Sequence, residues 1–140
     1  MSSIPHIKVS QVMRTEVHMI DPMTPVREAM RLMRQREVSS LVIARRDEHD
    51  ELGLVVVSDI ANAVIAKNLS PDRVDVYEIM SKPVITLDSD MDIRYAVRLL
   101  GNFGLSRGLV IDHQRNLVGI ATMRDMVLAY VEQEEKTVEA

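Results

Sequence analysis

Three polar side chains come together near residue 122, where an apolar stretch changes into a helical pattern. The octapeptide Gly119–Met126 contains a hydroxyl, a guanidinium and a carboxylate, at Thr122, Arg124 and Asp125. Free backbone N–H groups at the start of a helix attract anions such as phosphate. A carboxylate at the same place can accept hydrogen bonds from a diol. Together these groups could hold the ribose and the phosphate of a nucleotide.

The same residues also have a purely structural interpretation. Thr-x-x-Asp is the form of a capping box, in which side chains satisfy backbone N–H groups of the first helical turn. Capping is so common that the octapeptide alone favours the structural role. The two roles are compatible, and the repetition of this pattern along the chain strengthens the case for a ligand site.

An earlier copy of the pattern shows that the chain contains an internal repeat. Positions of the two copies correspond at an offset that changes by one residue, which a loop of different length explains. The matched pairs are Met13/Met80, Val17/Val84, Asp21/Asp88, Ala29/Ala96, Ser39/Ser106, Gly53/Gly119 and Asp59/Asp125.

Each copy is predicted to fold in the order β-α-β-β-α, from its runs of apolar residues and their spacing. The predicted strands are 17–20, 41–44 and 52–57 in the first copy, and 84–87, 109–111 and 117–121 in the second. In the first copy a helix should begin at Pro25, with Thr24 as its cap, and Ser89 and Asp90 offer caps in the second. The last helices are expected at 60–67 and 126–131.

These elements divide the chain into repeat 1 at residues 9–68, a linker at 69–76, repeat 2 at 77–132 and an acidic tail at 133–140. The tail lacks an apolar face, so we expect it to fray.

Composition excludes several classes of function. The chain has 140 residues, a net charge of −4 and no cysteine, which excludes disulfides and thiolate metal sites. An acidic balance without a basic stripe argues against nucleic-acid binding. We find no signal peptide and no apolar run long enough for a membrane span, so we expect a soluble cytoplasmic protein.

Several short motifs recur in a fixed order over residues 9–132. They are Val-Met-Arg at 12–14, Thr-Pro-Val at 24–26, Val-Ser-Ser-Leu at 38–41, Gly-Leu-Val-Val-Val-Ser-Asp-Ile at 53–60, Ile-Met-Ser at 79–81 and Leu-Ser-Arg-Gly-Leu-Val-Ile-Asp at 105–112, followed by the octapeptide. In their order and duplication, each copy resembles a CBS domain, named for cystathionine beta-synthase, and the tandem resembles a Bateman module.

The resemblance implies an α+β fold in which two β-α-β-β-α repeats pack as a pseudo-two-fold pair with two clefts. Each cleft would take its base-binding half from one repeat and its ribose–phosphate half from the other. Members of the family bind adenosine derivatives there, such as AMP, ADP, ATP or S-adenosylmethionine, and regulate other domains or proteins. The resemblance thus implies a regulatory module rather than an enzyme, with an effector protein as its partner.

Carried over by position, the family's motifs give one complete cleft. Its residues would be Arg14, His18, Val38, Ser39, Ser40, Thr122, Arg124 and Asp125. Val38 to Ser40 and His18 would line the base, Thr122 and Asp125 would hold the ribose, and Arg124 would face phosphate. Arg14 stands where the family often has threonine, so the family's pattern does not define its role.

The second cleft is expected to be weaker. Its residues would be Ser58, Asp59, Ser81, Ile85, Leu105, Ser106 and Arg107. The family's hydroxyl position is here occupied by Val56, and loss of one such hydrogen bond would cost roughly 0.5–1.5 kcal/mol.

Other motifs support alternatives more weakly. Asp88-x-Asp90-x-Asp92 starts like a calcium loop but lacks the glycine and glutamate that such a loop needs. The histidines show no metal-ligand spacing, so we predict no metal and no catalytic site. The arginines of the first helix, at 27, 31, 34 and 36, form either a solvated face or a patch for an anionic ligand or partner.

Two further expectations concern association. Tandem modules of this family commonly pair through their helices, so the resemblance implies a homodimer with the helices at 60–67 and 126–131 in contact. The alternative to a nucleotide-binding module is a structural or protein-interaction module with empty clefts.

Overall fold

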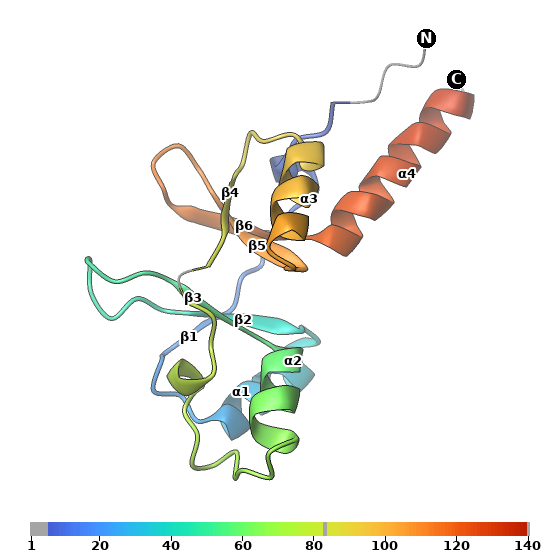
Figure 1. Ribbon diagram of the computed structural model, residues 1–140. Helices are drawn as coiled ribbons and strands as arrows, with labels where there is room; N and C mark the ends of the chain where they lie inside the picture. The colour runs from blue at the N-terminus through green and yellow to red at the C-terminus, as the bar shows by residue number, and fades with distance from the viewer. Residues whose placement is uncertain (1–5, 83, 140) are drawn as a thin grey trace. The chain divides into compact units, whose positions relative to one another are not determined.

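The computed structural model describes residues 6–82 and 84–139 (Figure 1). The chain forms two compact units. One is Val17–Val84, here called the middle unit. The other combines Met1–Glu16 with Ile85–Ala140 and is here called the terminal unit.

The middle unit contains a three-stranded sheet in the order β1-β2-β3, with β1 parallel to β2 and β2 antiparallel to β3. Its elements are β1 (Met19–Ile20), α1 (Val26–Arg36), β2 (Ser40–Ile43), β3 (Gly53–Val56) and α2 (Val57–Ile60), which continues as a π-helix (Ala61–Ile65), and a 3₁₀ turn (Val76–Glu78). The predicted order β-α-β-β-α is confirmed.

The terminal unit repeats this arrangement with the sheet order β4-β5-β6. Its elements are a 3₁₀ turn (Val9–Gln11), β4 (Thr86–Asp88), α3 (Ile93–Asn102), β5 (Arg107–Ile111), β6 (Leu117–Thr122) and α4 (Met123–Glu139). The two sheets and four helices agree with the predicted α+β class.

Buried apolar side chains fill one core in each unit, and each core includes a segment that precedes the unit's first strand or follows its last helix. The core of the middle unit is Val26, Ala29, Met33, Leu41, Ile43, Val55, Ile60, Val64, Val74 and Val76. The core of the terminal unit is Ile7, Val9, Leu87, Ile93, Ala96, Leu100, Val110, Ala121 and Met126. The compact units therefore do not coincide with the predicted sequence repeats. Residues 69–76, expected as a linker, contribute Val74 and Val76 to a core.

The helix starts differ from the predicted caps. In α1 the capping position is Pro25, and no side chain caps the helix, so the prediction of Thr24 is one residue early. In α3 the cap is Asp92, whose carboxylate accepts the Arg94 N–H at 2.8 Å. The predicted caps Ser89 and Asp90 are therefore wrong, because Asp92 directly precedes the first helical residue.

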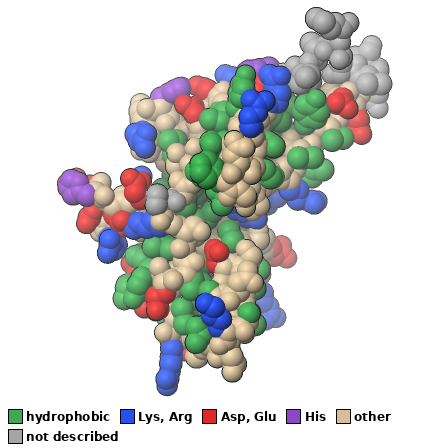
Figure 2. Space-filling view, viewed as in Figure 1, with side chains coloured by type: hydrophobic (Ala, Val, Ile, Leu, Met, Phe, Trp, Pro, Cys, Tyr) green, Lys and Arg blue, Asp and Glu red, His purple; other side chains and the backbone are tan. Residues whose placement is uncertain are grey.

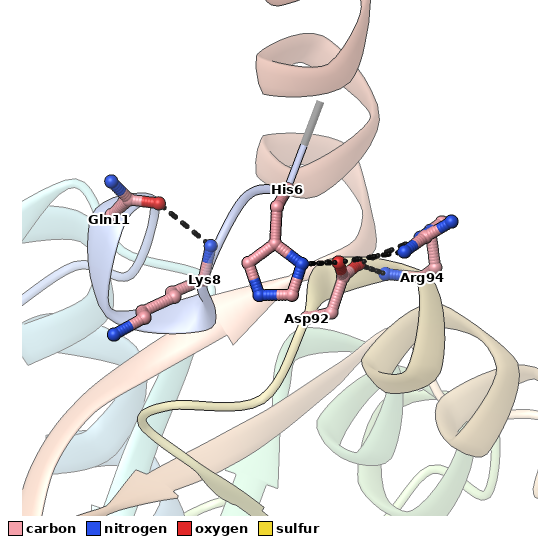
Figure 3. A network of polar contacts seen from close by, with 5 residues as sticks. All are labelled: His6, Lys8, Gln11, Asp92 and Arg94. Carbon is pink, nitrogen blue, oxygen red and sulfur yellow. Dashed lines mark hydrogen bonds and ion pairs between the residues drawn. The ribbon is translucent and has the colours of Figure 1, made fainter. Parts of the chain in front are cut away.

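Asp92 also ties the beginning of the chain to α3 (Figure 3). Its buried side chain accepts from His6 Nδ1 at 2.8 Å and from the Arg94 guanidinium at 3.2 Å. Hydrogen bonding by Arg94 is the main reason that the pKa of Asp92 lies below its ordinary value. Nearby, the Lys8 N–H donates to Gln11 Oε1 at 2.8 Å and closes the 3₁₀ turn.

Helix α4 is longer than predicted. It runs to Glu139 and includes residues expected to fray, while Ala140 lies outside the described residues. Glutamate, glutamine and lysine are good helix formers, and Lys136 pairs with Glu132 at 3.3 Å in the i, i+4 arrangement. These local preferences explain the extension, although residues 131–136 are exposed. Among the described helices, none combines the length and apolarity needed to cross a membrane.

Candidate functional site

The junction between β6 and α4 positions Thr122 and Asp125. Thr122 ends β6, and α4 begins at the next residue. The Asp125 N–H donates to Thr122 Oγ1 at 3.0 Å, which is one half of a capping box. The structural role of Thr122 is thus confirmed, and the Asp125 carboxylate points elsewhere.

The Asp125 carboxylate is paired with Arg14 of the N-terminal segment. Arg14 Nε donates to Oδ2 at 2.9 Å and Nη2 donates to Oδ1 at 3.4 Å. The Asp125 side chain is 18% exposed and that of Arg14 is 66% exposed. The Arg14 hydrogen bond is the largest cause that lowers the pKa of Asp125, and Thr122 and Arg124 lower it further.

Gly119 allows the N-terminal segment to reach this junction. Arg14 and Ile120 exchange two backbone hydrogen bonds of 2.9 Å each. A Cβ at Gly119 would lie 2.8 Å from the Arg14 carbonyl oxygen and 2.8 Å from Met13 Sδ. Only glycine therefore permits this approach without a shift of the backbone.

Arg107 is a further guanidinium near the same carboxylate. It lies on β5 directly opposite Thr122 in the strand register and is partly buried. Burial lowers the pKa of Arg107, and the charge of Arg14 lowers it further, while Asp125 raises it. The resemblance assigned Arg107 to the second cleft, and that assignment stays a prediction. The strand register that places Arg107 opposite Thr122 is not visible in the spacing of the sequence.

A hollow of about 350 Å³ opens beside the Arg14–Asp125 pair within the terminal unit. Its lining residues are Gln11, Val12, Arg14, Asp125, Leu128, Ala129 and Glu132. The N-terminal segment supplies one wall and α4 the other, so the exposed Arg14 side chain borders open space.

The corresponding junction of the middle unit uses its carboxylate differently. Asp59 Oδ2 accepts the backbone N–H of Val56 at 2.9 Å. Val56 offers no hydroxyl, and Ser81, which corresponds to Arg14, contacts Leu54 through two backbone hydrogen bonds of 2.8 and 3.0 Å. This carboxylate is therefore engaged by its own helix start.

The predicted base-binding segments lie next to the junctions of their own units. The Ser39 carbonyl accepts the first N–H of α2 from Val57 at 3.0 Å, and the Ser106 carbonyl accepts that of α4 from Met123 at 2.8 Å. Ser40 is buried, whereas Ser39 and Ser106 are exposed.

The residues of each predicted cleft are divided between the two units. Of the first set, Arg14, Thr122, Arg124 and Asp125 belong to the terminal unit, and His18, Val38, Ser39 and Ser40 to the middle unit. Of the second set, Ile85, Leu105, Ser106 and Arg107 belong to the terminal unit, and Ser58, Asp59 and Ser81 to the middle unit. Both composite sets stay predictions.

A larger hollow of about 680 Å³ lies within the middle unit, at the base of the hairpin between β2 and β3. Its lining residues are Asp21, Pro22, Met23, Arg45, Arg46, Asp50, Tyr77, Met80 and Lys82. Asp50 accepts the Arg46 N–H at 2.9 Å and pairs with Lys82, which holds the pKa of Asp50 far below its usual range. Figure 2 shows the charged side chains that cover this projecting hairpin. No sequence motif pointed to this pocket.

The terminal unit has a cluster of possible metal ligands at the end of its sheet that corresponds to the hairpin end of the middle unit. It consists of Asp88, Asp90 and His113, whose ligand atoms lie within 4.8 Å of one another. His113 Nε2 is 2.6 Å from Asp90 Oδ2, and all three side chains are exposed. Asp92 pairs with Arg94 and His6 instead, so the three aspartates of the calcium-like pattern do not converge on one point.

Similarity to known proteins supports a common family for both units. The family model for the CBS domain matches the chain twice, at residues 9–66 and 76–132. An uncharacterized protein of Methanopyrus kandleri is 33% identical over 137 residues, which cover 93% of this chain and 69% of that protein. The chain spans only 43% and 40% of the length of two further curated relatives.

Solved structures share the fold. The hexameric CBS-CP12 protein from bloom-forming cyanobacteria matches with a TM-score of 0.83 and 29% identity, over 87% of this chain and 67% of that one. A CBS domain pair in complex with 5′-methylthioadenosine and S-adenosyl-L-methionine matches with a TM-score of 0.78 and 25% identity, over 92% of this chain and 99% of that one. Since the family model covers most of the chain in two copies, the protein belongs to the CBS domain family.

Proposed function

We propose that this protein is a regulatory module that binds an adenosine derivative, with the ribose held at the start of α4. The observation that carries the proposal is the Asp125 carboxylate, which accepts from Arg14, whereas Asp59 at the matching position accepts the Val56 N–H at its own helix start. A ribose diol can replace the Arg14 guanidinium as the donor to Asp125. At Asp59 the diol would have to displace the Val56 N–H and so disrupt the start of α2.

A solved relative supports the class of ligand. The CBS domain pair that matches this chain over 92% of its length is in complex with 5′-methylthioadenosine and S-adenosyl-L-methionine. We extend adenosine binding to this chain, with Thr122 and Asp125 at the ribose and Arg124 with the α4 N-terminus facing phosphate. His18 and residues 38–40 remain the predicted base-binding residues.

The regulatory mechanism would be a shift of population. A ligand that binds one conformation of the module better than another raises the share of that conformation. An effector protein would then bind the favoured conformation, and the module itself would catalyse no reaction.

The experiment is a thermal-shift and calorimetry panel with AMP, ADP, ATP, 5′-methylthioadenosine and S-adenosylmethionine. A ligand at about 100 times its Kd should stabilise the protein by ~2.7 kcal/mol. Asp125→Asn should remove most of this shift, and the matched variant Asp59→Asn should retain it. If no adenosine compound shifts the transition, the proposal is wrong.

A second candidate, a protein-interaction module, is favoured by exposed apolar side chains on the helices. Val127, Leu128 and Val131 are exposed on α4, and Val57 and Ile65 are exposed in the helical segment after β3. We propose that these faces form a homodimer contact. Light scattering should give twice the chain mass, and Leu128→Glu should reduce it to the monomer mass. A wild-type monomer at micromolar concentration would contradict the homodimer.

A further inference from the structure

We propose that the hollow of about 680 Å³ in the middle unit, here called the hairpin pocket, binds a small organic carboxylate with an apolar body. Arg45 and Arg46 would hold the carboxylate of this ligand, and its body would lie against Met23 and Tyr77. None of the described lining residues belongs to either predicted cleft. The hairpin pocket is therefore a site distinct from the proposed adenosine site, and the two proposals are independent.

The walls of the hairpin pocket come from three segments that are joined to one another. The Tyr77 N–H donates to the Pro22 carbonyl oxygen at 3.1 Å, which links the 3₁₀ turn before β4 to the turn after β1. Asp50 pairs with Lys82 and so links the hairpin to the segment that follows this 3₁₀ turn. These links fix the pocket in the free protein, which reduces the entropy lost when a ligand binds.

The two carboxylates of the lining are already engaged by the protein. The Asp50 side chain is 8% exposed, accepts the Arg46 N–H at 2.9 Å and pairs with Lys82. The Lys82 hydrogen bond is the main reason that the pKa of Asp50 lies far below its usual range, so this carboxylate stays ionised and neutralises one cation. Asp21 Oδ1 accepts the Met23 N–H at 2.8 Å and fixes the turn after β1.

Two guanidiniums of the lining keep hydrogen-bond donors for a ligand. Arg45 is exposed, and its side chain forms no hydrogen bond or ion pair with any other described residue. Arg46 contacts Asp50 through Nε at 3.2 Å, and its two Nη groups make no hydrogen bond within the described part of the chain. Because arginine presents paired N–H groups whose geometry matches a carboxylate, these two residues can hold one together.

The balance of charge favours a ligand with a single negative charge. The described lining contains three cationic side chains and two carboxylates, which leaves one positive charge without a counterpart. Asp47, Glu48 and Glu51 are exposed on the same hairpin outside this lining. A carboxylate supplies the one missing charge. A phosphate dianion or a nucleotide polyphosphate would exceed it and would be repelled by the acidic residues of the hairpin.

The rest of the lining is apolar and suits an aromatic body. It comprises Pro22, Met23, Tyr77 and Met80. Met23 and Tyr77 are 62% and 47% exposed, so a ligand that covers them removes apolar surface from water. Aromatic rings contact both tyrosine rings and methionine sulfur favourably. The volume of the hairpin pocket also lies within the range of small-molecule sites.

The terminal unit shows that the fold does not require cations at this place. The parallel strand pairs of the two units have the same register at a constant offset along the chain, so Arg45 and Arg46 correspond to Asp112 and His113. Asp112 Oδ1 accepts backbone N–H groups of its own hairpin loop. Since this hairpin forms with an aspartate at the matching position, folding does not account for the cation at Arg45.

The experiment is a titration of the full ¹⁵N-labelled chain at pH 8, followed through amide shifts in NMR spectra. The probes are 3-phenylpropionate, its neutral amide 3-phenylpropionamide, and phenyl phosphate, which is a dianion at this pH. We expect saturable shifts with 3-phenylpropionate at millimolar concentration or below, at lining residues such as Met23, Arg45, Arg46 and Tyr77. The amide should bind at least about tenfold more weakly, because it loses a charge-assisted hydrogen bond. Phenyl phosphate should also bind more weakly than 3-phenylpropionate.

Substitutions separate the roles of the charge and of the apolar lining. Arg45→Gln should weaken 3-phenylpropionate binding by about tenfold and leave the amide unaffected, and Arg45→Asp, which copies the terminal unit, should abolish carboxylate binding. Tyr77→Ala should weaken both probes alike. The matched control Arg73→Gln removes the same charge from an exposed position of the middle unit outside the described lining, so it should bind as wild type does. Circular dichroism melting of each variant confirms folding.

Several results would overturn the proposal. They are an amide bound as tightly as the carboxylate, wild-type affinity in folded Arg45→Asp, shifts confined to residues outside the hairpin pocket, and no saturable shift with 3-phenylpropionate. Tighter binding of phenyl phosphate would overturn the assignment of a single negative charge. Asp125→Asn, which should remove adenosine binding, should leave 3-phenylpropionate binding unchanged, so failure of one proposal can be distinguished from failure of the other.

Discussion

The two strand–helix junctions occupy matching places in their units but use their carboxylates differently. In the terminal unit Thr122 caps α4, and Asp125 is left to pair with Arg14. In the middle unit Asp59 accepts the Val56 N–H instead. The difference shows how a duplicated fold can keep a carboxylate at one position and use it once for a distant partner and once for its own helix.

The residue facing each carboxylate explains the difference. Arg14 and Ser81 occupy matching places, each joined by backbone hydrogen bonds to the strand before its junction. A serine side chain is too short to reach the carboxylate as arginine does. Without a cation to attract it, Asp59 satisfies a backbone donor of the first helical turn, which is the common role of such a residue.

The largest difference should appear when alanine replaces each junction glycine. Gly119→Ala should destabilise the protein by about 1–3 kcal/mol, because the new Cβ would lie 2.8 Å from the Arg14 carbonyl oxygen. Gly53→Ala should cost less, because its closest contact at 2.6 Å is Met80 Sδ, the movable end of a side chain. Urea unfolding measures both, and equal losses would contradict this account of the glycines.

The next largest loss of stability should come from removing the side-chain cap of α3, which has no counterpart in α1. Asp92→Ala should cost about 0.5–2 kcal/mol at neutral pH as the loss of a cap, whereas α1 has no side-chain cap to lose. The pKa of Asp92 is lowered in the folded chain. Its ionised form therefore stabilises the fold above the pKa of the unfolded carboxyl, and this contribution disappears as the pH falls through the folded value. Unfolding curves of wild type and Asp92→Ala should converge in acid, and a constant gap would refute the assignment.

Removal of the two junction carboxylates, Asp59 and Asp125, should reduce the stability of the protein by different amounts. Asp59→Ala should cost about 1 kcal/mol, because a partly buried backbone N–H loses its acceptor. Asp125→Ala should cost about 0.5 kcal/mol or less, because the exposed Arg14 returns to water. Chemical denaturation without ligand checks the order, and a larger loss for Asp125→Ala would reverse our comparison of the two carboxylates.

The smallest effect should come from restoring the missing hydroxyl. Val56→Thr gives the middle junction an acceptor for the Asp59 N–H and should stabilise the fold by a few tenths of a kcal/mol, up to about 1 kcal/mol. The added variant Ser81→Arg should draw Asp59 away from the Val56 N–H, which amide hydrogen exchange at Val56 would detect as faster exchange. Unchanged protection in the double variant would show that Arg14 does not decide the orientation of its carboxylate.

Much of the fold was predictable because its signals are local. Apolar spacing predicted β-α-β-β-α in each copy, and the order of strands and helices agrees. The caps were harder: Thr24, Ser89 and Asp90 all looked suitable, yet the helix phase selected Pro25 and Asp92. The extension of α4 was missed because an exposed helical stretch without an apolar face resembles a tail.

The sequence by itself determined the duplication, the class of fold, the presence of a hydroxyl and a carboxylate at the start of α4, and the loss of that hydroxyl at Val56. These properties follow from residue types and short spacings. Only the tertiary structure decided that Arg14 pairs with Asp125, a residue 111 positions away. It also decided that Arg107 lies opposite Thr122 in the strand register and that Ile7 and Val9 complete the core of the terminal unit. Such contacts depend on which segments pack together, and spacing along a chain carries no information about that choice.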